Sequence, residues 1–205
     1  MCASQVLLIN KNERCPFCLS SEFNWEIEKC CQECFKRPLL LDGVAAAFDY
    51  EGPQATLIKE LKYGKKSYLA KSLGAFLFTQ LITLDWPIPD LIIPMPSTRL
   101  KQLERGFNQS YLIADSLAQL LNGQVTDILK RKSVDFSQAG LNLNQRLKLK
   151  SSSFGLKKIT SDLSHKSILL IDDVMTTGSS LKCCREALHP LLPKSIHALN
   201  VFRAI

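Results

Sequence analysis

One stretch near the C-terminus constrains the fold of this chain more than any other feature. It reads Ile168-Leu169-Leu170-Ile171-Asp172-Asp173-Val174-Met175-Thr176-Thr177-Gly178-Ser179-Ser180. An apolar run that ends in acids and small hydroxyl residues is typical of a buried parallel strand ending at a ligand, because open α/β sheets bind ligands beyond the carboxyl ends of their strands. Backbone N–H groups around Gly178, hydroxyl groups and the positive end of a following helix predict a cradle for a phosphate dianion.

The acid pair narrows the ligand class. Carboxylates repel phosphate but accept hydrogen bonds from vicinal hydroxyls, so Asp172 and Asp173 beside a phosphate cradle favour a sugar phosphate. The alternative is a strand followed by a capped helix, with the acids favouring the helix N-terminus. Capping needs only one such residue, and the stretch has many more, so we favour the ligand site.

The rest of the chain alternates between short apolar runs and helical patterns. We expect helices over 53–63, 68–81, 107–121 and 179–188, and strands over 44–50, 91–93, 125–129, 167–171 and 195–202, with a further short strand near Phe154 in a polar segment over 131–165. The prolines of Pro94-Met95-Pro96 are expected to hold the segment that follows extended. This alternation predicts a parallel sheet with helices on its faces.

The cysteines are concentrated near the N-terminus. Cys15-Pro16-Phe17-Cys18 and Cys31-Gln32-Glu33-Cys34 form two C-x2-C pairs, which predict a closed four-sulfur structural zinc site. Cys30 is an alternative to Cys31 as ligand, although the spacing favours Cys31. Disulfides, or cysteines that only pack, are weaker alternatives because the chain shows no secretion signal. We expect a zinc-ribbon element over 1–40 and a second domain over 41–205.

The formal net charge of +7 favours anionic partners. Lysines cluster over 59–71, and a second basic run is Lys130-Arg131-Lys132. Either run also suits an ordinary solvated surface. Tyr63 and Tyr68 lie near the first cluster and are candidates for stacking on bases, but we expect them to pack against helices instead. No apolar run approaches the roughly 20 residues that cross a bilayer, so we expect an intracellular, cytoplasmic protein.

The stretch over 168–180 resembles the motif by which type I phosphoribosyltransferases bind phosphoribosyl pyrophosphate (PRPP). Further motifs resemble the ComF family, also called ComFC or GntX-like proteins: the four cysteines, a Pro-x-Pro segment followed by Arg-Gly-Phe-Asn-Gln, and a Gln-x-x-Leu-x-x-x-x-Arg loop. They occur here in the family's order, as Cys15 to Cys34, Pro94 to Gln109, Gln138 to Arg146, and the 168–180 stretch. One departure is Lys150, which stands near the place where the family often has Asn.

The resemblance implies a Rossmann-like parallel sheet of the type I phosphoribosyltransferase fold with a small N-terminal zinc ribbon. PRPP would arrive with Mg²⁺. Asp172 and Asp173 would hold the ribose hydroxyls as the catalytic pair, and Lys62, Arg99 and Arg105 would neutralise the pyrophosphate. The remaining PRPP-binding positions are expected to be Val174, Met175, Thr176, Thr177, Gly178, Ser179 and Ser180.

The resemblance also implies a part in natural transformation, handling incoming single-stranded DNA at the cytoplasmic side of the inner membrane, with a protein of the competence machinery as a partner. The residues leave open whether the chain catalyses phosphoribosyl transfer or only binds PRPP. A salvage phosphoribosyltransferase for a purine or pyrimidine base is the alternative, although a zinc element is unusual for that activity.

Overall fold

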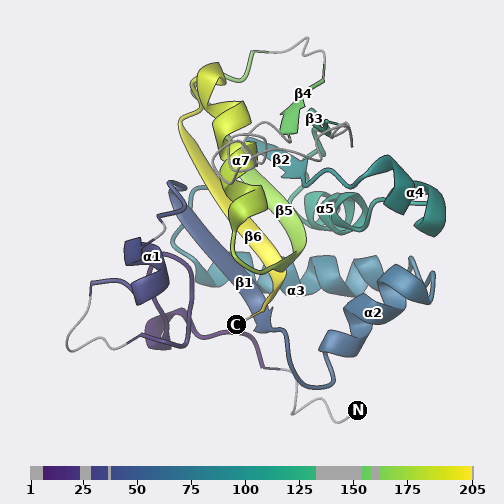
Figure 1. The fold of residues 1–205 in the computed structure, drawn as a ribbon, viewed down its shortest axis with the longest axis horizontal. Helices are drawn as coiled ribbons and strands as arrows, with labels where there is room; N and C mark the ends of the chain where they lie inside the picture. Colours follow the sequence, from purple (N-terminus) through teal and green to yellow (C-terminus); the bar gives the residue numbers. More distant parts are fainter. Residues whose placement is uncertain (1–6, 24–28, 37, 133–153, 158–161, 205) are drawn as a thin grey trace, which may run out of the picture.

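A computed structural model describes residues 7–23, 29–36, 38–132, 154–157 and 162–204 (Figure 1). Its main sheet has four parallel strands in the order β1 (Gly43–Asp49), β6 (Ser195–Arg203), β5 (Ser167–Met175) and β2 (Leu91–Pro94). A two-stranded antiparallel hairpin is formed by β3 (Leu129–Arg131) and β4 (Phe154–Leu156). The expected parallel α/β sheet is confirmed.

Helices cover both faces of the main sheet, and each face buries one side of every strand. On one face, Leu169 and Ile171 of β5 join a core cluster with α2 (Ala55–Tyr63), α3 (Leu69–Thr83) and α5 (Gln109–Leu120). On the other face, Ile168 and Leu170 join a cluster with α7 (Ser179–Leu188). Successive strand residues point to opposite faces, so two buried faces require the unbroken apolar runs seen in the sequence.

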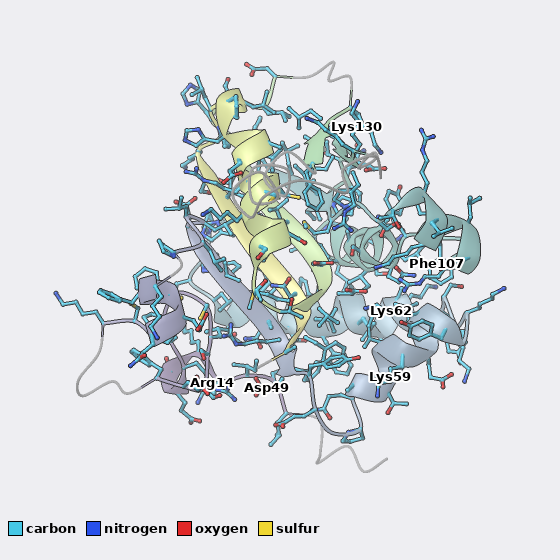
Figure 2. The ribbon with its side chains drawn as sticks, in the orientation of Figure 1. Arg14, Asp49, Lys59, Lys62, Phe107 and Lys130 are labelled. Atoms are coloured by element: carbon cyan, nitrogen blue, oxygen red, sulfur yellow. The ribbon has the colours of Figure 1, made fainter. Side chains whose placement is uncertain are left out.

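The N-terminal segment is attached to the edge of the sheet beside β1. It contains a short 3-10 helix, η2 (Lys11–Glu13), and the one-and-a-half-turn helix α1 (Gln32–Lys36). The amide of Ile9 donates to the carbonyl of Ala47 at 2.9 Å, and Ile9 and Leu19 belong to the same core cluster as α3 and α5. Arg14 also forms an ion pair with Asp49 of β1 at 2.7 Å (Figure 2). The N-terminal element therefore shares the core of the domain beside it.

The structure contains one helix that was not expected, and one expected strand is wrong. The segment after Pro96 is extended as far as Thr98, at φ −70° and ψ 150°, and α4 (Arg99–Arg105) then follows. The Thr98 hydroxyl accepts from the amide of Lys101 at 3.3 Å, and Gly106, at φ +83°, ends the helix. The strand expected over 125–129 begins only at Leu129, and Val125 forms just an isolated bridge to Ile92.

The strand expected to end at Ile171 continues to Met175. Beyond Ile171, β5 keeps its pairing with β6 as far as Arg203, but β2 has already ended at Pro94, the partner of Ile171. The last four residues of β5, 172–175, thus pair with no strand on that side within the described part of the chain. None of the helices within the described ranges combines the length and apolar character that crossing a bilayer requires.

Candidate functional site

The turn that follows β5 lies at the carboxyl edge of the sheet, where the sequence predicted it. Thr176, Thr177 and Ser179 are exposed, and the hydroxyls of Thr177 and Ser179 lie 2.8 Å apart. Gly178 has φ +68° and is the N-cap of α7, which favours glycine because a side chain is strained in this region. Residues 174–181 line a small cavity of about 60 Å³ together with Asp172. The turn therefore presents exposed hydroxyls at the positive end of a ten-residue helix.

Asp172 and Asp173 have different partners although they are neighbours. One oxygen of Asp172 accepts from the hydroxyl of Ser110 at 3.0 Å and from the amide of Asp173 at 2.9 Å. Burial, reinforced by the charge of Asp173, raises the pKa of Asp172 to about 7. Asp173 instead forms an ion pair with Lys62 of α2 at 2.7 Å. Asp172 is thus a poorly compensated carboxylate, and such groups cluster at functional sites.

Both acids line a pocket of about 250 Å³. It brings together several of the predicted site residues: Lys62, Arg105, Asp172, Asp173 and Ser180. Arg105 is fixed in place, because its guanidinium donates to the side chain of Gln109 at 3.0 Å and lies 5.4 Å from the ring centroid of Tyr63. A set of basic side chains therefore faces the two acids across this pocket.

Four further pocket residues were missed by the sequence analysis as site residues: Lys101, Asn108, Ser110 and Arg131. Asn108 and Ser110 directly follow the Arg-Gly-Phe segment, and Arg131 belongs to the second basic run, so both signals were present. Their meeting with the acid pair depends on the packing of α5 on β5 and on the pairing of β3 with β4, which no local pattern specifies.

Arg99 is the predicted anion-binding residue that the structure does not bring to the acids. It lines a second, larger cavity of about 620 Å³. The two cavities share four wall residues, namely Pro96, Ser97, Asn108 and Arg131. The larger cavity is also lined by Lys130, Lys157 and Tyr111, so it too is basic. Lys157 is paired with Asp127 at 2.6 Å, whereas Lys130 has no ion-pair partner among the described residues.

Tyr63 and Tyr68 do not pack against helices as expected. Their exposed fractions are 75% and 66%. In α2 the core-facing positions are taken by Ile58 and Leu61, which leaves Tyr63 at the solvent-facing end of the helix. The loop motif formed by Gln138, Leu141 and Arg146, with the nearby Lys150, lies outside the described residues.

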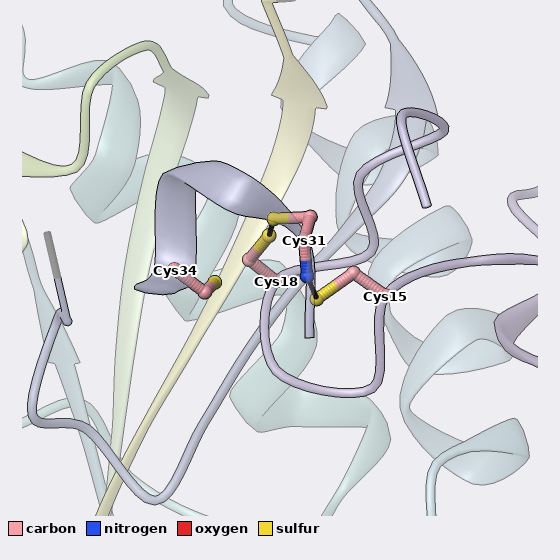
Figure 3. A group of neighbouring side chains, drawn as sticks. All are labelled: Cys15, Cys18, Cys31 and Cys34. Carbon is pink, nitrogen blue, oxygen red and sulfur yellow. Dashed lines mark hydrogen bonds between the residues drawn. The ribbon is translucent and has the colours of Figure 1, made fainter. Parts of the chain in front are cut away.

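The four predicted zinc ligands come together in the N-terminal element. The Sγ atoms of Cys15, Cys18, Cys31 and Cys34 all lie within 4.8 Å of one another, and those of Cys18 and Cys31 are 3.6 Å apart (Figure 3). A zinc–sulfur distance of about 2.3 Å places the sulfurs of a tetrahedral site roughly 3.8 Å apart, so the cluster has the size and donor set for a metal such as zinc. Cys31, and not Cys30, is the member of this cluster.

Comparisons with known proteins agree with this arrangement. The family description "Phosphoribosyl transferase domain" matches residues 108–204. Competence protein F of Haemophilus influenzae is 26% identical over 196 residues, covering 92% of this chain and 85% of the relative. DNA utilization protein YhgH of Escherichia coli O157:H7 is 28% identical over 156 residues, covering 74% of this chain and 67% of the relative.

A third relative carries the name of the family itself. Competence protein ComFC of Streptococcus pneumoniae is 24% identical over 195 residues, covering 93% of this chain and 81% of the relative. The similarity to the competence proteins thus extends across both the cysteine cluster and the acid-lined pocket. On these relatives, the matched domain and the parallel sheet, the chain is similar to the ComF competence proteins over most of its length and has the phosphoribosyltransferase fold.

Proposed function

We propose that the chain binds PRPP in the acid-lined pocket and uses it in the handling of incoming single-stranded DNA. The proposal that the chain binds PRPP rests on the geometry at the end of β5. An open, glycine-containing turn at a helix N-terminus directly follows two acids, and one of these acids has a pKa raised to about 7. A sugar phosphate fits both the turn and the acids, because the turn binds its phosphate and the acids accept hydrogen bonds from its hydroxyls.

The ligand is proposed to span the pocket from the turn to the basic wall. The amides and hydroxyls of Thr176, Thr177, Gly178 and Ser179 hold the 5-phosphate, with Val174, Met175 and Ser180 completing the cradle. Asp172 and Asp173 hold the ribose hydroxyls. The pyrophosphate lies toward Lys62 and Arg105, with Lys101 and Arg131 as additional cations from the same wall. Arg99 contributes only from the neighbouring cavity.

Mg²⁺ is proposed to arrive chelated by the pyrophosphate, where it would neutralise charge. Among the described residues, the cysteine cluster is the one group of three or more metal-ligating side chains that lies close enough to hold an ion. This agrees with a magnesium ion carried in by the ligand. Zinc is proposed for the cysteine cluster, which leaves no position for a water and so has a structural role. Residues 1–40 then form the zinc-stabilised unit and 41–205 the phosphoribosyltransferase-like domain.

The chain's own contribution to glycosyl transfer would be electrostatic. A ribose ring that loses pyrophosphate develops positive charge at C1, and the adjacent carboxylates of Asp172 and Asp173 would stabilise it. The basic wall would stabilise the departing pyrophosphate. The described residues contain no group that identifies an acceptor base, so binding without turnover fits the same pocket. The names of the relatives favour a DNA-related role over base salvage.

DNA handling is proposed on the strength of those relatives, named for competence and for DNA utilization. The larger cavity is the place where we expect a strand to bind, because Arg99, Lys130 and Arg131 line it and Tyr111 adds an aromatic side chain to its wall. It adjoins the PRPP pocket through Arg131. We further propose that the chain acts at the cytoplasmic side of the inner membrane, with a protein of the competence machinery as partner.

Titration calorimetry with PRPP and Mg²⁺ tests the central assignment. Native protein is compared with Asp172→Asn/Asp173→Asn and with Asp115→Asn, a control acid on α5 whose side chain bonds only its neighbour Gln119 among the described residues. We expect the double variant to bind PRPP at least about tenfold more weakly, since each lost hydrogen bond to a charged group contributes about 1.5–3 kcal/mol. Equal affinity for all three proteins would refute the assignment of the acids.

A fluorescent single-stranded oligonucleotide tests the DNA surface. Arg99→Ala/Lys130→Ala is compared with Lys166→Ala/Lys194→Ala, which removes the same charge at the opposite, amino-terminal edge of the sheet. We expect only the first pair to weaken binding and to reduce its dependence on salt concentration. Equal losses from both pairs would place the strand elsewhere.

A further inference from the structure

The cysteine cluster and the phosphate turn, far apart in the sequence, lie against each other in the fold. A cavity of about 60 Å³ separates them. One side is formed by Cys18, Glu33 and Cys34 and the other by the residues of the turn, Met175, Thr176, Thr177 and Gly178, with Leu39 and Arg203 between the two sides. A metal ligand thus shares a cavity wall with the proposed 5-phosphate site.

Leu39 is the first link between them. A Cβ atom added to Gly178 would lie 2.5 Å from Cδ2 of Leu39 and 3.2 Å from its Cδ1. The side chain of Leu39 therefore packs directly on the Gly178 α-carbon. Leu39 lies in the short connection from α1, which carries Cys34, to β1. Its position is fixed at one end by the cysteine cluster and at the other by the sheet.

Arg203 is the second link. It is the last residue of β6, is buried, and pairs in register with Met175, the residue just before the turn. Its guanidinium donates from Nη1 to the carbonyl of Cys18 at 2.8 Å. The next amide, of Ala204, donates to the carbonyl of Met175 at 2.8 Å. The buried guanidinium of Arg203 thus links the backbone of Cys18, one of the metal ligands, to the end of β5, where the turn begins.

We propose that the metal-bound cysteine cluster positions the phosphate turn, with Leu39 and Arg203 as positioning residues, so that PRPP affinity depends on the metal. The amides of the turn bind phosphate strongly only when they are already aligned, because aligning them on binding costs conformational entropy. Gly178 is the most conformationally free residue of the turn, and Leu39 packs on that residue. This inference rests on the proposed function for the identity of the ligand, but not for the coupling itself.

The coupling is reciprocal, which gives it a readout independent of activity. If the metal strengthens PRPP binding by some factor, PRPP must strengthen metal binding by the same factor. With Mg²⁺ kept at the same excess over the chelator in both samples, about tenfold more of a chelator that prefers zinc should therefore be needed to remove the metal from native protein when PRPP saturates it. The same comparison in Leu39→Ala should show a much smaller difference.

The decisive experiment combines hydrogen exchange with PRPP titration on the full chain. Leu39→Ala, which keeps every cysteine, is compared with Leu41→Ala, a matched control that packs on the same core cluster. Of the two variants, we expect only Leu39→Ala to exchange the amides of 174–180 faster than native protein and to bind PRPP about tenfold more weakly. Native protein stripped of its metal should behave in the same way. The amides of α5 should exchange at the same rate in all of these proteins.

Unchanged exchange in the turn of Leu39→Ala and of the metal-free protein would overturn the coupling, as would equal PRPP affinity in native protein and both leucine variants. A native protein that binds no PRPP would overturn the proposed function. In that case the exchange rates of the turn still decide whether the cluster positions it.

Discussion

Asp172→Asn should make the ligand-free protein more stable, although it removes a residue of the proposed site. Burial and the neighbouring Asp173 raise the pKa of Asp172 to about 7, against about 3.9 in an unfolded chain. Between these values the folded protein holds a proton that the unfolded chain has lost, so the native protein loses stability as the pH rises from about 4 to about 7. About three pKa units at 1.36 kcal/mol each set a ceiling of roughly 4 kcal/mol on this loss.

Asparagine removes the titration but keeps an oxygen that can accept from Ser110 or from the amide of Asp173. Between pH 5 and pH 8 the variant should therefore gain about 2–3 kcal/mol relative to native protein. At about 2–4 °C per kcal/mol for a chain of this size, its melting temperature should gain about 4–12 °C on native protein over that interval.

The assay is thermal unfolding of both proteins at pH 5 and pH 8 without PRPP. The difference in melting temperature between the two proteins is compared at the two pH values. Groups that titrate equally in both proteins, including the cysteine cluster, do not contribute to that comparison. The ion pair of Lys62 with Asp173 is present in both proteins. The reasoning is refuted if the difference in melting temperature is the same at both pH values, because the charge of Asp172 would then cost the fold nothing.

Three other predictions have equally definite outcomes. Gly178→Ala places a side chain at φ +68° and 2.5 Å from Cδ2 of Leu39, so it should cost at least about 1–2 kcal/mol of stability, measured by urea unfolding; a neutral effect would contradict both the left-handed turn and the Leu39 contact. Lys62→Met leaves the carboxylate of Asp173 without its ion pair, so PRPP affinity should fall by about tenfold in calorimetry while metal content stays unchanged. Cys31→Ser should abolish stoichiometric metal in elemental analysis whereas Cys30→Ser retains it, and the reverse result would reassign the cluster.

The strand, turn and helix around Gly178 were predictable because each has a strong local signal. The expected helix over 179–188 coincides with α7, since Gly178 and the hydroxyl residues mark its start. The cysteine cluster was equally predictable, because paired C-x2-C turns specify their own geometry. In both cases the residues that make the site are close together in the sequence.

Helix α4 shows where the sequence was misread. The two prolines indicated an extended segment, and it ends at Thr98; the sequence analysis missed that Thr98 and Gly106 are the cap residues of a helix between them. The helix also explains why Arg99 and Arg105 separate. At 100° per residue they lie on different faces of α4, whereas Lys101 and Arg105, four positions apart, share a face and line the same pocket.

The remaining site residues depend on contacts between distant elements. Ser110 reaches Asp172 because α5 packs on β5, and Arg131 reaches the pocket because β3 pairs with β4. The contact of Leu39 with Gly178 joins segments more than a hundred positions apart. Such contacts follow from the packed fold and have no periodicity or spacing that a sequence could show.

The most direct test of the account is a crystal structure of the protein with PRPP and Mg²⁺. We predict the 5-phosphate among the amides of 176–179, the ribose hydroxyls on Asp172 and Asp173, and the pyrophosphate toward Lys62 and Arg105. Ligand density confined to the larger cavity, with the turn after β5 left without phosphate, would contradict it.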